Sequence, residues 1–189
     1  MEQPFISLER AKTQVNEIVD DAYAGFEKRV FSDPGLVGAG SKPISDLRKP
    51  AIAWKKLGFG IAGRTRCESN IIEMNINYLY SRDYDRFIRY TSLHELAHSI
   101  AFQLFDDARH DGIWRNIDRL LGGGSSCCHD YARPINAPKK LRYIYECPRC
   151  GTIFRLSERR NKTVFDGTYR CMKCKTNLLE ARFVEKTFL

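Results

Sequence analysis

The segment His94-Glu95-Leu96-Ala97-His98 lies in the middle of a helical pattern and sets the expectation for both architecture and chemistry. On an α-helix, two histidines four residues apart lie on one face, so their imidazoles can reach a single ion. The glutamate between them can take a proton from a water molecule on that ion, which lowers the pKa of the water toward about 7. The pattern therefore predicts a catalytic zinc site with Glu95 as the general base.

The helix that carries this segment is predicted to begin at Asp83, as its N-cap, and to run to about Phe105. Its apolar residues recur over a broad surface, which indicates cover by other elements on several sides. We therefore expect this helix to be central in its domain. The apolar positions are Phe87, Tyr90, Leu93, Leu96, Ala97, Ile100, Ala101 and Leu104.

A catalytic zinc needs a third protein ligand and one open position. His110 is the best candidate, because it lies in a turn before the next predicted helix and a reversal of the chain can bring it back beside the first two histidines. Asp118 is a weaker alternative. The remaining histidine, His129, can stabilise an oxyanion, bind substrate, serve as an alternative ligand or simply lie exposed.

The flanking segments predict a small sheet accompanied by helices. In some segments the apolar residues recur every three to four positions, as in a helix, and in others every second position, as in a strand. Gly and Pro separate the segments. An α+β fold with the zinc motif on a central helix is therefore expected. The predicted elements are a helix over 7–31, a loop over 35–50, strands over 51–57, 59–65 and 72–78, and a helix over 113–121.

The end of the chain contains two Cys-x-x-Cys pairs separated by 20 residues, Cys147 with Cys150 and Cys171 with Cys174. This spacing is typical of a zinc ribbon, in which four thiolates close the coordination of a structural zinc and fold a module with little core. We predict two domains, a catalytic domain over 1–140 and a small β-rich ribbon over 141–189. The other three cysteines, Cys67, Cys127 and Cys128, are interpreted as ordinary packing or surface thiols.

The net charge of +8 is concentrated in the ribbon: residues from Lys139 onward contain 13 Lys and Arg against 5 Asp and Glu. Basic residues interleaved with aromatic residues are suited to phosphate contact and base stacking, so DNA is the expected partner. A second basic stretch, Ser41–Arg66, can add to this surface. The predicted nucleic-acid contacts are Arg149, Arg155, Arg159, Arg160, Lys162, Arg170, Lys173 and Lys175, and the aromatic residues are Tyr143, Tyr145, Phe154, Phe165 and Tyr169.

Length and composition favour an ordered, soluble protein. Hydrophobic residues make up 43% of the 189, enough for a core, and no apolar run reaches the roughly 18 residues that a membrane span needs. The segment Met1–Ser7 lacks the features of a secretory signal, so reduced thiols and an intracellular location, cytoplasmic or DNA-associated, are expected. We expect no membrane partner and a monomer.

In its order of parts, the chain resembles the SprT-like metalloprotease family, over roughly residues 5 to 180. The combination of the zinc motif, a downstream histidine and a C-terminal ribbon is more specific than the zinc motif alone. In place of the His-Gly expected from the family pattern, this chain has His110-Asp111-Gly112. The motifs that carry the resemblance are Trp54, Ala62-Gly63-Arg64-Thr65, Ile72-Glu73-Met74-Asn75, His94-Glu95-Leu96-Ala97-His98, and His110 with Gly112 and Trp114.

The resemblance implies a zincin-like domain with His94, His98 and His110 as zinc ligands and Glu95 as the catalytic acid/base. Better-understood relatives are DNA-dependent proteases, including the Spartan proteins, which digest proteins covalently trapped on DNA. The leading hypothesis is thus a zinc metallopeptidase that acts on protein bound or crosslinked to DNA. The alternatives are a non-catalytic nucleic-acid-binding ribbon protein with a silent hydrolase fold, and a zinc enzyme acting on a non-protein amide.

Overall fold

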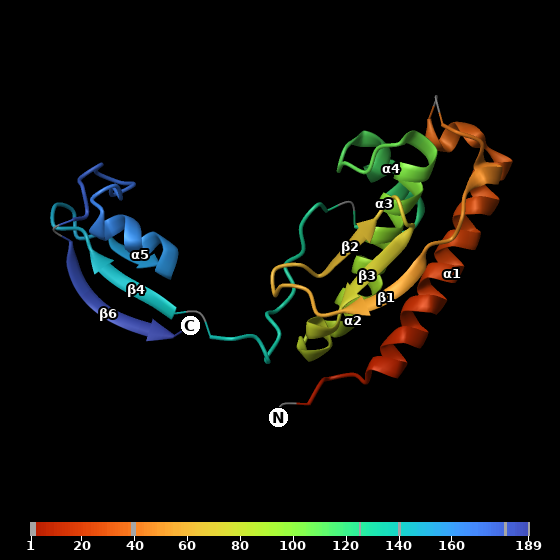
Figure 1. Ribbon diagram of the computed structural model, residues 1–189. Helices are drawn as coiled ribbons and strands as arrows, with labels where there is room; N and C mark the ends of the chain where they lie inside the picture. The colour runs from red at the N-terminus through yellow and green to blue at the C-terminus, as the bar shows by residue number, and fades with distance from the viewer. Residues whose placement is uncertain (1–2, 39–40, 125, 140, 180, 189) are drawn as a thin grey trace. The chain divides into compact units, whose positions relative to one another are not determined.

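The computed structural model describes residues 3–38, 41–124, 126–139, 141–179 and 181–188 (Figure 1). The chain divides into two compact units, Met1–Ala137 and Pro138–Leu189, close to residue 140, where the sequence predicts a boundary. Each unit has its own apolar core. The first combines helices with a small sheet and the second contains a cysteine cluster, which confirms the predicted α+β class.

The sheet of the first unit has three strands in the order β1-β3-β2. Strand β3 (Ile71–Asn75) lies in the centre, parallel to β1 (Ala51–Lys55) and antiparallel to β2 (Gly63–Arg66). The first two strands of the sequence therefore do not pair as a hairpin, because β3 lies between them. Strand β2 is left at the edge of the sheet.

The predicted third strand, 72–78, ends earlier in the structure. Strand β3 stops at Asn75, whose side-chain oxygen accepts a hydrogen bond from the main-chain N–H of Asn77 at 3.1 Å. This local bond caps the 3-10 helix η3 (Ile76–Tyr80), and such side-chain bonds compete with a strand ladder. The strand prediction beyond Asn75 is therefore wrong.

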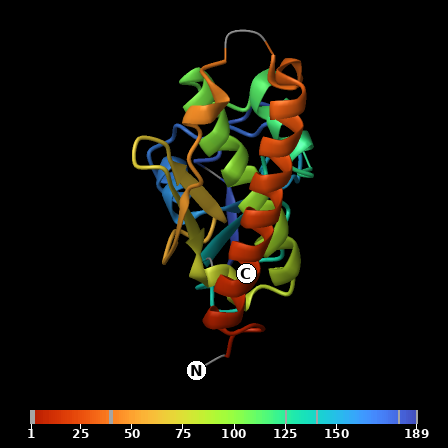
Figure 2. The same ribbon diagram turned by 90° about the vertical axis from the view of Figure 1, so that its right-hand side faces the viewer.

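The long helix α1 (Leu8–Ser32) confirms the predicted N-terminal helix and begins at Ser7, whose hydroxyl caps it. Figure 2 shows α1 running along the length of the first unit. Its buried face includes Val15, Phe26 and Val30, which belong to the same core as the central helix. Among the helices within the described ranges, none has the length and apolar character needed to cross a membrane.

The predicted central helix consists of three consecutive segments, α2 (Tyr84–Arg86), the π-helical turn η4 (Phe87–Thr91) and α3 (Ser92–Phe105). Asp83 lies at the start as predicted, but its side chain makes no capping bond; it accepts a hydrogen bond from the N–H of Ala132 at 2.6 Å. Helix α3 packs against β2 and β3, with α1 and α4 (Gly112–Leu120) beside it (Figure 1). The zinc motif is thus carried by the central helix.

The second unit is a three-stranded antiparallel sheet in the order β5-β4-β6 with one helix. Its small core includes Tyr145, Leu156 and Leu178 and two of its four cysteines. The helix was not predicted from the sequence. The elements are β4 (Leu141–Glu146), β5 (Ile153–Leu156), α5 (Glu158–Phe165) and β6 (Arg182–Phe188).

Candidate metal centre

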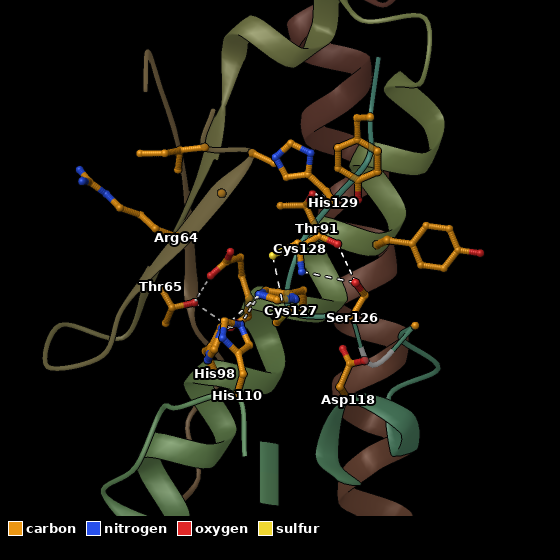
Figure 3. Close-up of a pocket in the computed structure, with 18 of the residues that line it drawn as sticks. Arg64, Thr65, Thr91, His98, His110, Asp118, Ser126, Cys127, Cys128 and His129 are labelled. Carbon is orange, nitrogen blue, oxygen red and sulfur yellow. Dashed lines mark hydrogen bonds between the residues drawn. The ribbon is translucent and has the colours of Figure 1, made fainter. Parts of the chain in front are cut away.

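The Nε2 atoms of three histidines converge at one point of the first unit. The distance from His98 to His94 is 3.1 Å, from His98 to His110 3.0 Å and from His110 to His94 3.1 Å. His94 and His98 come from consecutive turns of α3, and His110 comes from the turn before α4. Figure 3 shows the rings of His98 and His110 pointing toward each other.

This donor set fits a tetrahedral metal ion. Zinc binds imidazole nitrogen at about 2.0–2.1 Å, so two ligands of a tetrahedral zinc lie about 3.3 Å apart, close to the three distances observed here. Neutral imidazoles whose Nε2 lone pairs point toward one point repel one another, and a cation at that point removes the repulsion. The three imidazoles therefore form a group that can hold a metal ion.

Helix α4 sets the position of His110. The helix begins at Asp111, whose carboxylate accepts a hydrogen bond from the N–H of Trp114 at 3.0 Å. The residue inserted relative to the family pattern is therefore the N-cap of α4. Trp114 is fully buried, and its ring lies 4.6 to 5.3 Å from the rings of all three histidines. The indole forms the floor of the histidine cluster.

The environment keeps the three imidazoles neutral, the form that binds metal. Burial, together with a smaller effect of the neighbouring imidazoles, lowers the pKa of His94 to about 4 and that of His98 to about 3. Burial also lowers the pKa of His110. The main chain of Ser126 accepts a hydrogen bond from His94, which has the opposite, smaller effect on its pKa. Such bonds fix the orientation of a ligating ring.

Glu95 lies beside the cluster and is held by Thr65 of β2. The hydroxyl of Thr65 donates to the main-chain oxygen of Glu95 at 2.7 Å and to its Oε2 at 2.9 Å. Glu95 is only 6% exposed, and burial raises its pKa to about 7. A cation at the three imidazoles would favour the ionised form. The hydrogen bond from Thr65 thus holds the carboxylate at Oε2.

The close approach of β2 to α3 depends on Gly63. A Cβ atom at this position would lie 2.6 Å from Cγ2 of Thr91 and 3.1 Å from Cγ of Glu95. Both distances are shorter than ordinary contacts between carbon atoms. Only glycine therefore allows the strand to lie this close to the helix that carries the carboxylate.

The cluster opens into a cavity of about 1070 Å³. One wall is the edge strand β2 with the residues before it, from Gly60 to Thr65, and the opposite wall contains residues 126–131. His129 lies in this second wall, exposed, with Nε2 3.4 Å from the hydroxyl of Tyr78 and its ring stacked on Tyr131. It is not among the clustered imidazoles.

Asp118, the alternative third ligand, lines the same pocket but does not belong to the histidine cluster. Figure 3 places Asp118 apart from His98 and His110. The main-chain oxygen of Asp118 accepts a hydrogen bond from Gly123 at 2.7 Å, and a Cβ at position 123 would collide with its carboxylate. Asp118 thus packs against the glycine turn that follows α4.

A second candidate metal site lies in the other unit. The sulfur atoms of Cys147 and Cys174 are 3.6 Å apart, as are those of Cys150 and Cys171. Ligands of a tetrahedral zinc with bonds of about 2.3 Å would be separated by about 3.75 Å, which matches this spacing. All four positions predicted from the two Cys-x-x-Cys pairs are brought together.

The two basic surfaces predicted from the sequence differ in how many of their basic side chains pair with acids. In the stretch Ser41–Arg66, most basic side chains pair with acids from elsewhere: Lys42 with Asp106, Lys49 with Asp20, and Lys55, Arg64 and Arg66 with the buried Glu73. All eight predicted contacts in the ribbon are exposed, and none of them lies within salt-bridge distance of an acid among the residues described. The uncompensated positive charge therefore belongs to the ribbon.

The aromatic residues of the ribbon are not equally available for stacking. Tyr145 is 4% exposed, and its hydroxyl donates to Asn161 at 2.6 Å, so it is a core residue. Phe165, at the end of α5, is 71% exposed. Phe154 and Tyr169 are half-buried and contact each other edge to face. Base stacking at Tyr145 would require the core to open, whereas Phe165 is accessible.

The sequence did not identify three features of the site: Thr65 as a hydrogen-bond donor to Glu95, Trp114 beneath the imidazoles, and the main chain of Ser126 at His94. The segment Ala62–Thr65 and Trp114 carry the family resemblance, so a signal for two of them was present. Ser126 acts through its main chain, which any residue type could supply, so the sequence gives no signal for it.

Comparisons with known proteins agree with this geometry. The family model described as the SprT-like family matches residues 27–131. Protein SprT of Pseudomonas entomophila is 33% identical over 135 residues, which cover 69% of this chain and 80% of the relative. Protein SprT of Pseudomonas putida (strain F1) is 32% identical with the same coverage. No solved structure matches the chain. On the family match and these identities, the chain belongs to the SprT-like family.

Proposed function

We propose that this chain is a zinc-dependent metallopeptidase that hydrolyses proteins bound or crosslinked to DNA. The observation that carries the peptidase proposal is the convergence of three imidazole nitrogens at 3.0 to 3.1 Å, with a buried glutamate beside them at the base of a large pocket. His94, His98 and His110 would hold the metal. Zinc bound there would supply a Lewis acid and a water molecule of lowered pKa.

Glu95 has the geometry of a general base. Because Thr65 donates a hydrogen bond to Oε2, Oε1 is the atom that would accept a proton from the attacking water and later pass it to the leaving amine. A purely structural metal site does not require a general base beside its ligands. The placement of Glu95 therefore supports a catalytic site over the silent one.

The edge strand β2 supports a peptide as the substrate. Its inner edge pairs with β3, and its outer edge has no partner strand in the described part of the chain and borders the pocket. An extended peptide can add to such an edge through main-chain hydrogen bonds, which places its carbonyl groups along the wall next to Glu95. A small non-protein amide would make no use of this edge.

The ribbon supports the DNA-associated part of the proposal. Eight exposed basic residues, three of them on α5, lie there without acidic partners among the described residues, and phosphate contacts need this kind of surface. The proposed location is accordingly inside the cell, at DNA. The two parts of the proposal have separate tests.

The test of peptide hydrolysis uses the full chain loaded with zinc and an unstructured protein as substrate. Glu95→Gln should retain the metal and lose nearly all activity, because the proton acceptor is replaced by an amide of the same size. Glu17→Gln, on the exposed side of α1, is the matched control and should remain active. Equal activity of the Glu95 variant would refute the proposal, and an inactive wild type that binds DNA would favour the non-catalytic alternative.

The test of DNA association compares two double charge reversals. Arg159→Glu with Arg160→Glu, on α5, should weaken DNA binding and reduce the dependence of affinity on salt, because phosphate contacts release counterions. Arg10→Glu with Lys28→Glu, on α1, makes the same change in net charge and should have little effect. Equal losses for the two pairs would mean that only total charge matters and would contradict a ribbon contact.

A further inference from the structure

The adjacent cysteines Cys127 and Cys128 line the pocket of the candidate metal centre and have no part in the proposed hydrolysis. Their Sγ atoms are 3.6 Å apart, and both side chains are exposed. The sequence suggested ordinary thiols, but the structure places the pair in the wall that faces β2. Figure 3 shows both cysteines beside Ser126 in this wall. Two accessible thiols this close can be joined by a two-electron oxidant.

A disulfide between these neighbours would require a change in the main chain. The sulfur atoms would have to approach from 3.6 Å to about 2.05 Å. The Cα atoms of adjacent residues are about 3.8 Å apart across a trans peptide, below the range of about 4.4–6.8 Å for ordinary disulfides. Such a linkage is strained, and strained disulfides are easily reduced. The chemistry therefore fits a reversible modification rather than a structural crosslink.

The main chain that would have to move adjoins Ser126, which is hydrogen-bonded to one of the three clustered histidines. The hydroxyl of Ser126 donates to the oxygen of Cys128 at 2.6 Å and accepts from its N–H at 3.4 Å, so these bonds span the peptide between the cysteines. The main chain of Ser126 also accepts the hydrogen bond from His94. Rotation of the Cys127–Cys128 peptide would turn the N–H of Cys128 away from the Ser126 hydroxyl, and the two adjoining peptides, which carry the oxygen of Cys128 and that of Ser126, would have to adjust.

We propose that Cys127 and Cys128 form a reversible redox-modification site, at which a peroxide joins the two thiols and thereby weakens metal binding at His94. In the first step one thiol loses its proton and the thiolate attacks an oxygen atom of hydrogen peroxide; the O–O bond breaks, a sulfenic acid forms, and the departing hydroxide takes up the proton and leaves as water. The second thiol then attacks that sulfur, forms the S–S bond and releases a second water. The peroxide gains two electrons, and the two thiols together lose two electrons and two protons.

The inference rests on the metal site of the proposed function but not on peptide hydrolysis. The loss of an outer partner of a ligating histidine lowers metal affinity by about 10- to 100-fold. We therefore expect zinc to leave the histidine site at least about 10-fold faster after oxidation, and a dithiol reductant to restore the original rate. Reduced protein should keep its zinc.

The experiment treats the zinc-loaded full chain with hydrogen peroxide and compares four proteins: wild type, Cys127→Ser, Cys128→Ser and Cys67→Ser. Peptide mapping reports the linkage as a loss of two hydrogens from the peptide that contains both cysteines, and a zinc indicator reports release. The Cys67 variant is the matched control, because this thiol lines the same pocket and has no cysteine next to it in the sequence.

The linkage and the faster release should occur in wild type and Cys67→Ser and be absent from the other two variants. All four proteins keep the ribbon cysteines, so zinc lost from the ribbon is common to them and cancels in the comparison. Absence of the linked peptide would overturn the proposal, and so would a linked peptide with unchanged zinc release. Neither readout requires peptidase activity, so a failure of the proposed function would be seen separately.

Discussion

Replacing Thr65 by valine tests whether Glu95 must be held in place to act. Valine keeps the branched shape of the side chain but removes the hydroxyl that lies 2.9 Å from Oε2 of Glu95. The single hydroxyl proton is shared with the main-chain oxygen of Glu95 at 2.7 Å, so one three-centre hydrogen bond is lost. The main-chain oxygen is within α3, and the helix itself remains intact.

A hydrogen bond to a charged group contributes about 1.5–3 kcal/mol. If this bond positions the base during proton transfer, the same free energy is lost from the transition state, and about 1.4 kcal/mol corresponds to a factor of ten in rate. We therefore expect Thr65→Val to lower kcat/KM by about 10- to 100-fold. Thr65→Ser keeps the hydroxyl and should stay close to wild type.

The assay is hydrolysis of an unstructured fluorogenic peptide by the zinc-loaded chain, with the metal content of each variant measured on the same sample. The metal content should be unchanged, because Thr65 does not contact the imidazole nitrogens. Wild-type kcat/KM in the valine variant would refute the positioning role of Thr65. An equal loss in the serine variant would also refute it, since the hydroxyl would then not be the cause.

Three further changes test other parts of the structure. Gly63→Ala should lower the free energy of unfolding by about 1–3 kcal/mol, measured with urea, because its Cβ would lie 2.6 Å from Thr91; an unchanged midpoint would contradict the close approach. His110→Ala should reduce the zinc content from two ions per chain to one, measured by elemental analysis, and a content of two would exclude this ligand. Hydrogen bonds from Arg66, Lys55 and Arg64 together lower the pKa of Glu73 to about 2, so the contribution of this carboxylate to stability is complete above about pH 4.5 and is lost as the pH falls toward 2. Glu73→Gln should remove this acid-sensitive part of the urea midpoint, and an unchanged pH dependence would argue against it.

Local spacing allowed most members of the two clusters of candidate metal ligands to be predicted from the sequence. Two histidines four residues apart share a helix face whatever surrounds the helix, and a Cys-x-x-Cys pair forms its knuckle from its own turn. The hydrogen bonds from Thr65 to Glu95 could not be predicted in this way. They depend on the register of β2 against β3 and on how closely the sheet approaches α3, across 30 residues of sequence. No periodicity within either segment contains that information.

The pairing of β2 with β3 also explains why the positive charge of the stretch Ser41–Arg66, which the sequence suggested as a nucleic-acid surface, is largely compensated in the structure. Side chains of a strand alternate between its two faces, so Gly63 and Thr65 lie toward α3 while Arg64 and Arg66 lie on the opposite face. There both arginines pair with Glu73, which the adjacent strand β3 brings opposite Arg64. A count of charges along one segment cannot include an acid that strand pairing supplies. The same four residues thus hold Glu95 on one face and neutralise a buried carboxylate on the other, so the excess positive charge of the chain lies in the ribbon.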